Sequence, residues 1–166
     1  MTKPTDTVVE ILGKVGLFQG LRSDQVALVA LAHEMTLESH PAKHQLLVEG
    51  ELGDKLFILL EGQVAVYRKT QEGEPYKLAI LEASQSPSLG EGGLIEAEPR
   101  SATVVCEQNC RFLVLTREAF LRFTTKNPAW GVPVLLQVSA QTMKRLRQAT
   151  LDVALLHKAL MNEIRG

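Results

Sequence analysis

The spacing of apolar residues changes twice along the chain and divides it into three parts. Residues 8–15 carry apolar side chains at helical spacing, and Ser23 is placed to cap a second helix that ends near His33. The middle of the chain has short runs rich in β-branched residues, separated by Gly, Pro, Asn or Ser. We therefore predict helices, then a region of short strands, then helices again.

The predicted strands are short and lie at 35–39, 45–48, 56–60, 63–68, 77–81, 102–106 and 111–115. Hairpin turns are expected at Glu61-Gly62 and Glu72-Gly73. No helix of useful length fits between the strands, which argues against a βαβ fold. The pattern predicts an α+β protein in which an antiparallel β-roll, a double-stranded jelly-roll-like barrel, lies between N-terminal helices and a long C-terminal helix.

The last part of the chain is helical, with two interruptions. Thr116 is placed to cap a short helix through Phe123, which Asn127-Pro128 ends. Because a proline ring is tolerated only in a first helical turn, Pro133 leads us to expect the next helix over 134–164. The resulting division is an N-terminal helical segment (1–34), a β-roll (35–115) and C-terminal helices (116–166).

One face of the long helix carries residues at alternating spacings of four and three, as in a coiled coil. These seam residues are Thr142, Leu146, Ala149, Val153, Leu156 and Leu160. The seam predicts a homodimer formed through this helix. Leu151 and Leu155 widen the apolar face, so that packing of the helix back onto the roll is the alternative.

The composition narrows the class of protein further. Of the 166 residues, 45% are hydrophobic and 22% charged, which is typical of a globular domain with a real core. The net charge of −1 gives no electrostatic reason to expect nucleic acid or an anionic membrane as partner. Charges interrupt the short apolar run at the N-terminus, so we expect neither a secretory signal nor a membrane span. Cys106 and Cys110 are either free thiols of a cytoplasmic protein or a strained cross-turn disulfide.

The segment LGEGGLIEAEPRSAT, residues 89–103, combines three glycines with a carboxylate and an arginine. The glycines let backbone N–H groups approach a ligand, and a single helical turn over 92–96 favours an anion at its start. Arg100 adds a fork suited to phosphate. Since Glu91 repels phosphate, it must face a hydroxyl donor. An anion beside a hydroxyl describes a sugar phosphate or a nucleotide, and the alternative is a surface ion pair between Glu91 and Arg100.

This segment resembles the phosphate-binding cassette of cyclic nucleotide-binding domains, as in bacterial catabolite activator proteins and protein kinase A regulatory subunits. That cassette reads roughly Phe-Gly-Glu-x-Ala-Leu-x-x-x-x-Pro-Arg-x-Ala-Thr, and the matching positions are Gly90, Glu91, Leu94, Pro99, Arg100, Ala102 and Thr103. The stretch EGELGDKLFILLEGQVAVY (49–67) resembles the strand-pair block of the same family. With LFQGL near the start and SAQ…RL in the last helix, the resemblance covers about residues 17–160.

The resemblance implies a role for individual residues. Glu91 is expected to accept a hydrogen bond from the ribose 2′-hydroxyl. Arg100 is expected to hold the exocyclic oxygens of the cyclic phosphate, with the backbone N–H groups of Gly93 and Ser101 and the Ser101 hydroxyl helping. Asp54 matches an aspartate that buttresses the cassette arginine, or is a plain turn residue. The expected ligand-binding residues of the cassette (89–104) are Leu89, Gly90, Glu91, Gly92, Gly93, Arg100, Ser101 and Ala102, with no catalytic residue, metal or cofactor.

The cassette departs from the family pattern at two places. Leu89 replaces an aromatic residue, and Gly92-Gly93 replaces Leu-Ala. Because each glycine in a helix costs on the order of 1 kcal/mol relative to alanine, we expect a looser cassette that binds more weakly. In the last helix, Ala149-Thr150 aligns with the Thr-Ser pair that meets adenine in the catabolite activators. Thr150 is therefore a candidate base contact or a solvated helix residue, and cAMP is favoured while cGMP stays open.

These observations predict a non-enzymatic sensor of cAMP or cGMP that moves its C-terminal helix to signal to a separate protein. The family's transcription factors continue with a helix-turn-helix domain, whereas this chain ends after the helix, so a stand-alone sensor is expected. We expect Lys144, Arg145 and Arg147 to form a solvated helix face. The alternatives are a degenerate dimerisation scaffold that binds no nucleotide, and a cupin-like metal enzyme, for which His40 and His44 are the only close histidine pair near strands.

Overall fold

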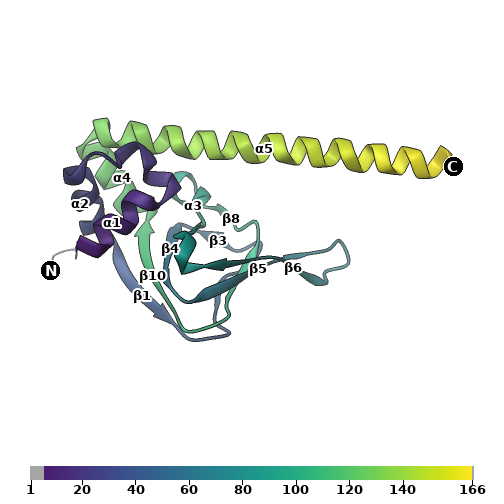
Figure 1. Cartoon of the computed structure of the whole chain (residues 1–166), viewed down its shortest axis with the longest axis horizontal. Coiled ribbons are helices and arrows are strands. Elements are labelled where there is room, and N and C mark those ends of the chain that lie inside the picture. Colours follow the sequence, from purple (N-terminus) through teal and green to yellow (C-terminus); the bar gives the residue numbers. More distant parts are fainter. Residues whose placement is uncertain (1–5, 166) are drawn as a thin grey trace.

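A computed structural model describes residues 6–165 of the chain. Two antiparallel four-stranded sheets form a roll, and helices from both ends of the chain pack together at one side of it (Figure 1). One sheet has the order β1-β10-β4-β7 and the other β2-β9-β5-β6, while β3 pairs only with β8. The predicted α+β fold, with its β-roll and long C-terminal helix, is confirmed.

The strands, in chain order, are β1 (Thr36–His40), β2 (Gln45–Leu47), β3 (Leu52–Gly53), β4 (Lys55–Glu61), β5 (Gln63–Lys69), β6 (Pro75–Glu82), β7 (Ser88–Leu89), β8 (Glu98–Pro99), β9 (Thr103–Cys106) and β10 (Cys110–Thr116). A three-residue 3-10 turn, η2 (Ala83–Gln85), follows β6. All seven predicted strands are present, and β3, β7 and β8, of two residues each, were missed. The predicted turn at Glu61-Gly62 is confirmed, and Gly62 adopts the left-handed φ of 91° that this tight connection requires.

Strand β4 separates two hydrophobic cores. Its side chains alternate, so that Leu56 and Ile58 pack against the helices, whereas Phe57 and Leu59 point into the roll. The same alternation divides the apolar residues of the neighbouring strand β10. Burial on both faces explains why β4 reads as an uninterrupted apolar run rather than as an alternating pattern.

The N-terminal helices are α1 (Asp6–Lys14), the 3-10 helix η1 (Gly16–Leu21) and α2 (Gln25–His33). The prediction that Ser23 caps α2 was wrong by one residue. Asp24 is the N-cap, and its Oδ1 accepts a hydrogen bond of 2.9 Å from the backbone N–H of Ala27. The other carboxylate oxygen, Oδ2, accepts a bond of 2.9 Å from the indole Nε1 of Trp130, which ties α2 to the C-terminal helix.

We expect Asp24→Ala to lower the free energy of unfolding by about 2 kcal/mol, because it removes a helix cap and leaves the indole N–H of Trp130 without its partner. For a chain of this size that corresponds to a fall in melting temperature of about 4–8 °C. Ser23→Ala is the matched control and is expected to change the free energy by less than about 0.5 kcal/mol. Equal destabilisation by the two variants in thermal denaturation would contradict the assignment of the cap.

The C-terminal helices are α4 (Arg117–Lys126) and α5 (Pro128–Arg165). Thr116 caps α4 as predicted, because its Oγ1 accepts from the N–H of Ala119. The prediction that Pro133 delays the long helix was wrong, since α5 begins at Pro128, the position where proline is tolerated. The ring of Pro133 lies against Gly20 of η1, where a Cβ would come within 2.7 Å of it. Pro133 therefore lies inside α5, with its ring packed closely against η1.

Helix α5 contains 38 residues, so it is about 57 Å long and extends well past the roll (Figure 1). Val134 and Val138 in its first turns are buried in the core between the helices. Beyond them the apolar side chains are exposed, with Val153 at 65% and Leu156 at 70%. The helix therefore does not fold back onto the roll, and that alternative is excluded.

Cys106 and Cys110 are both buried and both free, so the disulfide alternative is excluded. Burial, together with the neighbouring Cys110, raises the pKa of Cys106 to about 12. At neutral pH the thiol is protonated and behaves as a small apolar side chain in the core of the roll. Within residues 6–165, no helix is both long enough and apolar enough to cross a membrane.

Candidate functional site

The segment that connects the two sheets carries the candidate site. After β7 the chain turns at Gly90, whose φ is 77°, and then forms the single helical turn α3 (Gly92–Ile95) that the sequence predicts. Leu94 of this turn is fully buried and anchors it to the core. Strand β8 follows, and its pairing with β3 positions Arg100 immediately after it.

The guanidinium group of Arg100 is held by the backbone. Its Nη1 donates to the carbonyl oxygen of Gly90 at 3.0 Å, and its Nη2 donates to that of Lys55 at 2.7 Å. The group also lies directly against Gly53, Gly90 and Gly93, where any Cβ would crowd or overlap it. Burial lowers the pKa of Arg100, while the nearby carboxylates of Asp54, Glu91 and Glu98 act in the opposite direction. Arg100 is thus a positive charge that is held in a fixed position against three glycines.

Glu91 is the one charged residue among those described that is buried, with 8% of its surface exposed. Its Oε1 forms an ion pair with Nη2 of Arg145 on α5, and no other polar partner of this carboxylate is found among the described residues. Because each carboxylate oxygen can accept more than one hydrogen bond, this ion pair leaves acceptor capacity unused. Glu91 is therefore poised to accept a hydrogen bond from a ligand.

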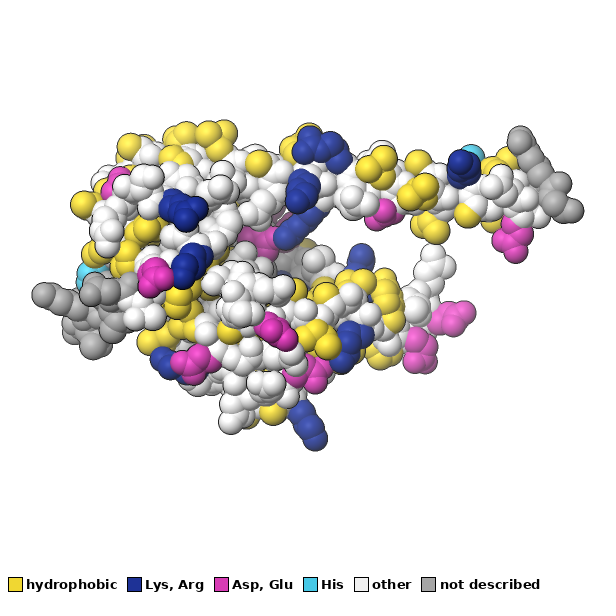
Figure 2. Space-filling view, in the orientation of Figure 1, with side chains coloured by type: hydrophobic (Ala, Val, Ile, Leu, Met, Phe, Trp, Pro, Cys, Tyr) yellow, Lys and Arg dark blue, Asp and Glu magenta, His cyan; other side chains and the backbone are white. Residues whose placement is uncertain are grey.

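These two residues open onto one cavity of about 600 Å³. Figure 2 shows the hollow between the roll and α5, with basic side chains of α5 at its edge. One end is polar and is formed by the cassette, whereas the other is formed by side chains of β2, β5, β6 and β9, which are apolar apart from Arg68. The apolar residues are Leu47, Val66, Leu78, Leu81 and Val104. The volume and the division into a charged end and an apolar end suit one small amphipathic ligand with an anionic group.

The eight cassette residues expected to bind ligand all line this cavity: Leu89, Gly90, Glu91, Gly92, Gly93, Arg100, Ser101 and Ala102. The backbone N–H of Gly93 donates to Gly90 at 3.1 Å and so closes the turn. Their binding roles remain predictions.

Thr150 and Asp54 are not brought to the cavity. Thr150 lies five residues beyond Arg145, about 7.5 Å further along the helix, and its hydroxyl donates to the carbonyl of Leu146. Its role as a base contact therefore stays a prediction. Asp54 forms no ion pair with Arg100 among the described residues, and it acts on that group only through its charge.

Arg145 is the site residue that the sequence analysis missed. The prediction that it belongs to a solvated helix face holds for its exposure, since 69% of its side chain is exposed, but its guanidinium also lines the cavity and contacts Glu91. Lys144 and Arg147 are likewise exposed, and they do not line the cavity. The spacing of Val138, Thr142 and Arg145 by four and three residues places all three on one helix face, and this was the signal available in the sequence.

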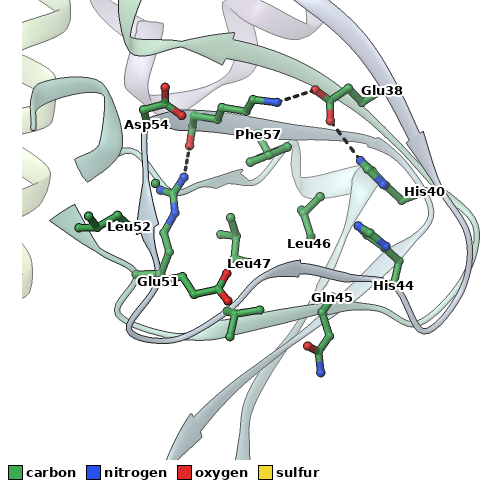
Figure 3. Close-up of a pocket in the computed structure, with 14 residues that line it drawn as sticks. Glu38, His40, His44, Gln45, Leu46, Leu47, Glu51, Leu52, Asp54 and Phe57 are labelled. Atoms are coloured by element: carbon green, nitrogen blue, oxygen red, sulfur yellow. Dashed lines mark hydrogen bonds and ion pairs between the residues drawn. The ribbon is translucent and has the colours of Figure 1, made fainter. Parts of the chain in front are cut away.

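A second, smaller cavity of about 310 Å³ lies on the other side of Arg100, which lines both. Figure 3 shows it, with Glu38 bonded to His40 at 3.2 Å and to the Lys55 amine at 3.1 Å. Burial acts to raise the pKa of Glu38, but hydrogen bonds from Lys55 and His40 outweigh it and lower that pKa. The His40 and His44 rings are stacked with centroids 4.3 Å apart. Between residues 6 and 165, no group of three metal-ligating side chains comes together, as a cupin-like site requires.

Comparison with known proteins decides the family. The family model described as "Cyclic nucleotide-binding domain" matches residues 37–127, which is more than half of the chain and includes the whole cassette. The chain belongs to the cyclic nucleotide-binding domain family. The resemblance that the cassette residues indicated is confirmed.

Relatives in this family support the same assignment. The chain is 28% identical to the CRP-like cAMP-activated global transcriptional regulator of Mycobacterium tuberculosis over 144 residues. This match covers 87% of this chain and 62% of that protein. Its fold matches the catabolite activator protein of Thermus thermophilus with a TM-score of 0.73 and 28% identity, over 85% of this chain and 62% of that one. A cyclic nucleotide-binding domain from Methylobacillus flagellatus matches with a TM-score of 0.72 and 29% identity, over 85% and 77%. The chain spans about three fifths of the curated relatives it matches first.

Proposed function

We propose that this protein is a sensor that binds a cyclic nucleotide in the 600 Å³ cavity and signals through α5. The observation that carries the proposal is the ion pair between Glu91 of the cassette and Arg145 of α5. A ligand that hydrogen-bonds Glu91 alters this pair and thereby acts on the helix. The curated relative from Mycobacterium tuberculosis is described as activated by cAMP, which supports the ligand class.

In this proposal each end of the cavity takes one part of the ligand. Arg100 holds the cyclic phosphate, with Ser101 beside it, and Glu91 accepts the ribose 2′-hydroxyl. The base lies against the apolar residues at the other end, where base edges find few directional partners apart from Arg68. Adenine, which needs fewer hydrogen bonds to the protein than an oxygen-bearing guanine, fits this lining better, so cAMP is the preferred ligand and cGMP the weaker one.

Signalling requires that the nucleotide binds one position of α5 better than another. Arg145 supplies such a dependence, because it links Glu91 to the helix only when the helix lies close to the cassette. We propose that the exposed apolar seam of α5 forms a homodimer, and that a separate protein reads the change in helix position. A cytoplasmic location is in keeping with the two free thiols.

The coupling through Arg145 can be separated from binding. We expect cAMP to change the amide hydrogen exchange of residues 139–150 in the wild type, and Arg145→Gln to abolish that change while the dissociation constant shifts by less than about tenfold. Arg147→Gln, on the same helix but outside the cavity, is the control and is expected to respond like the wild type. A response of the Arg145 variant identical to that of the wild type would show that the helix is not coupled through this ion pair.

A further inference from the structure

Gly92, the first residue of α3, leaves a space that the side chain of Glu98 fills. A Cβ on Gly92 would overlap with the carboxylate oxygen Oε1 of Glu98, and the three atoms nearest to such a Cβ all belong to Glu98. The backbone of Glu98 is fixed, because β8 pairs with β3 through Gly53 and Glu98. The Glu98 carboxylate therefore lies over the first turn of α3.

Glu98 shares the polar end of the cavity with Arg100. Both side chains line it, and the charge of Glu98 acts on the Arg100 guanidinium from two residues away. Glu91 adds another carboxylate at the same end, but Arg145 neutralises it. No ion pair joins Glu98 to any residue of the described chain, so of the two carboxylates that line the cavity it is the one whose charge no ion pair offsets.

We propose that Glu98 is a selectivity residue, whose carboxylate repels the phosphate that reaches Arg100 and thereby discriminates against dianionic nucleoside monophosphates in favour of monoanionic cyclic ones. This inference rests on the proposed function. A cyclic phosphodiester carries one negative charge at all pH values above its first ionisation. A phosphate monoester carries nearly two once the pH exceeds its second pKa of about 6.

The physical basis is the proportionality of electrostatic repulsion to charge. A dianion at the same position meets about twice the repulsion free energy that a monoanion meets. Since affinity depends exponentially on free energy, removal of the Glu98 charge improves the affinity for a dianion by about the square of the factor found for a monoanion. That relation separates selectivity by charge from a general loosening of the cassette.

Glycine at position 92 is what admits this carboxylate, because a side chain there would expel it. Gly93 differs, since a Cβ on Gly93 would lie 2.5 Å from the backbone oxygen of Gly53. Substitution of Gly92 thus displaces the far end of a flexible side chain, whereas substitution of Gly93 disturbs the backbone. Gly92→Ala is accordingly a second way to remove Glu98 from the cavity without changing its charge.

The test is calorimetric titration with cAMP and with 5′-AMP at pH 8 and low salt. Glu98→Gln is expected to tighten cAMP binding about three- to tenfold, and 5′-AMP binding by roughly the square of that factor. The gain is expected to shrink in 0.5 M salt, because the charges are then screened. Glu96→Gln is the matched control, since Glu96 is exposed on the same turn but does not line the cavity, and it should change either affinity less than about twofold.

Two further outcomes decide the inference. Gly92→Ala is expected to raise the affinity for 5′-AMP relative to cAMP, as Glu98→Gln does. Adding Glu98→Gln to Gly92→Ala is expected to change the affinities little further, because both changes act through the Glu98 carboxylate. A second outcome is that the wild type binds cAMP while Glu98→Gln changes the affinities for cAMP and 5′-AMP by equal factors, or changes neither. Either result would overturn the role of Glu98 and leave the proposed function intact. If neither protein binds either nucleotide, the proposed function fails, and the role of Glu98 fails with it.

Discussion

Replacement of Arg100 by alanine is expected to weaken cyclic nucleotide binding by at least roughly 100-fold, because it removes the fixed positive charge opposite the phosphate. The guanidinium is held in place by the carbonyl groups of Gly90 and Lys55 before any ligand arrives. Because two hydrogen bonds to the backbone already order the Arg100 side chain, it loses little conformational entropy when the ligand binds. Calorimetry with cAMP and cGMP measures the loss directly.

Two controls accompany this variant. Arg100→Lys keeps a positive charge but lacks the planar fork, so it is expected to recover only part of the affinity. Arg111→Ala removes an exposed arginine of β10 that pairs with Glu61 on the neighbouring strand β4, and it is expected to leave binding unchanged. Circular dichroism of each variant verifies that the fold is kept. Full affinity in a folded Arg100→Ala protein would exclude this cavity as the phosphate site.

A second large effect is expected for the double variant Val153→Asp, Leu160→Asp, which is predicted to be monomeric. Both side chains are exposed in the single chain and lie seven residues apart on the seam, so a dimer buries them together. Burial of two carboxylates from each chain without partners is prohibitive, and we expect the dimer dissociation constant to rise at least roughly 1000-fold. Sedimentation velocity at micromolar concentration distinguishes the two states.

Leu151→Asp provides the matched control for the dimer. Leu151 is similarly exposed, at 58%, but lies on the opposite side of the helix from Val153 and Leu160, given 3.6 residues per turn, so the expectation that it widens the seam face was wrong. This variant is expected to remain dimeric. A monomeric wild-type protein, or a dimeric Val153→Asp, Leu160→Asp variant, would refute dimerisation through α5.

The cassette could be predicted from the sequence because its function depends on neighbours along the chain. The glycines, Glu91 and Arg100 lie within eleven residues, so they belong to one connecting segment, whose resemblance to the family cassette identified them. The structure places all of them on the same cavity. Local features such as the cap at Thr116 and the turn at Gly62 were accessible for the same reason.

The errors concern contacts between distant parts of the chain. Arg145 reaches Glu91 only because α5 packs across the cassette, which no local pattern in the sequence shows. Pro133 is accommodated by contact with Gly20, more than a hundred residues earlier, which no local propensity reveals. The strands β3 and β8 are too short to show any alternation of side chains.

The central claim is that this chain binds a cyclic nucleotide in the cavity between the cassette and α5. Calorimetric titration of the wild-type protein with cAMP, and separately with cGMP, tests it most directly. We predict saturable binding of one nucleotide per chain, tighter for cAMP than for cGMP. The absence of binding heat with both nucleotides, confirmed at a second temperature, would contradict the claim.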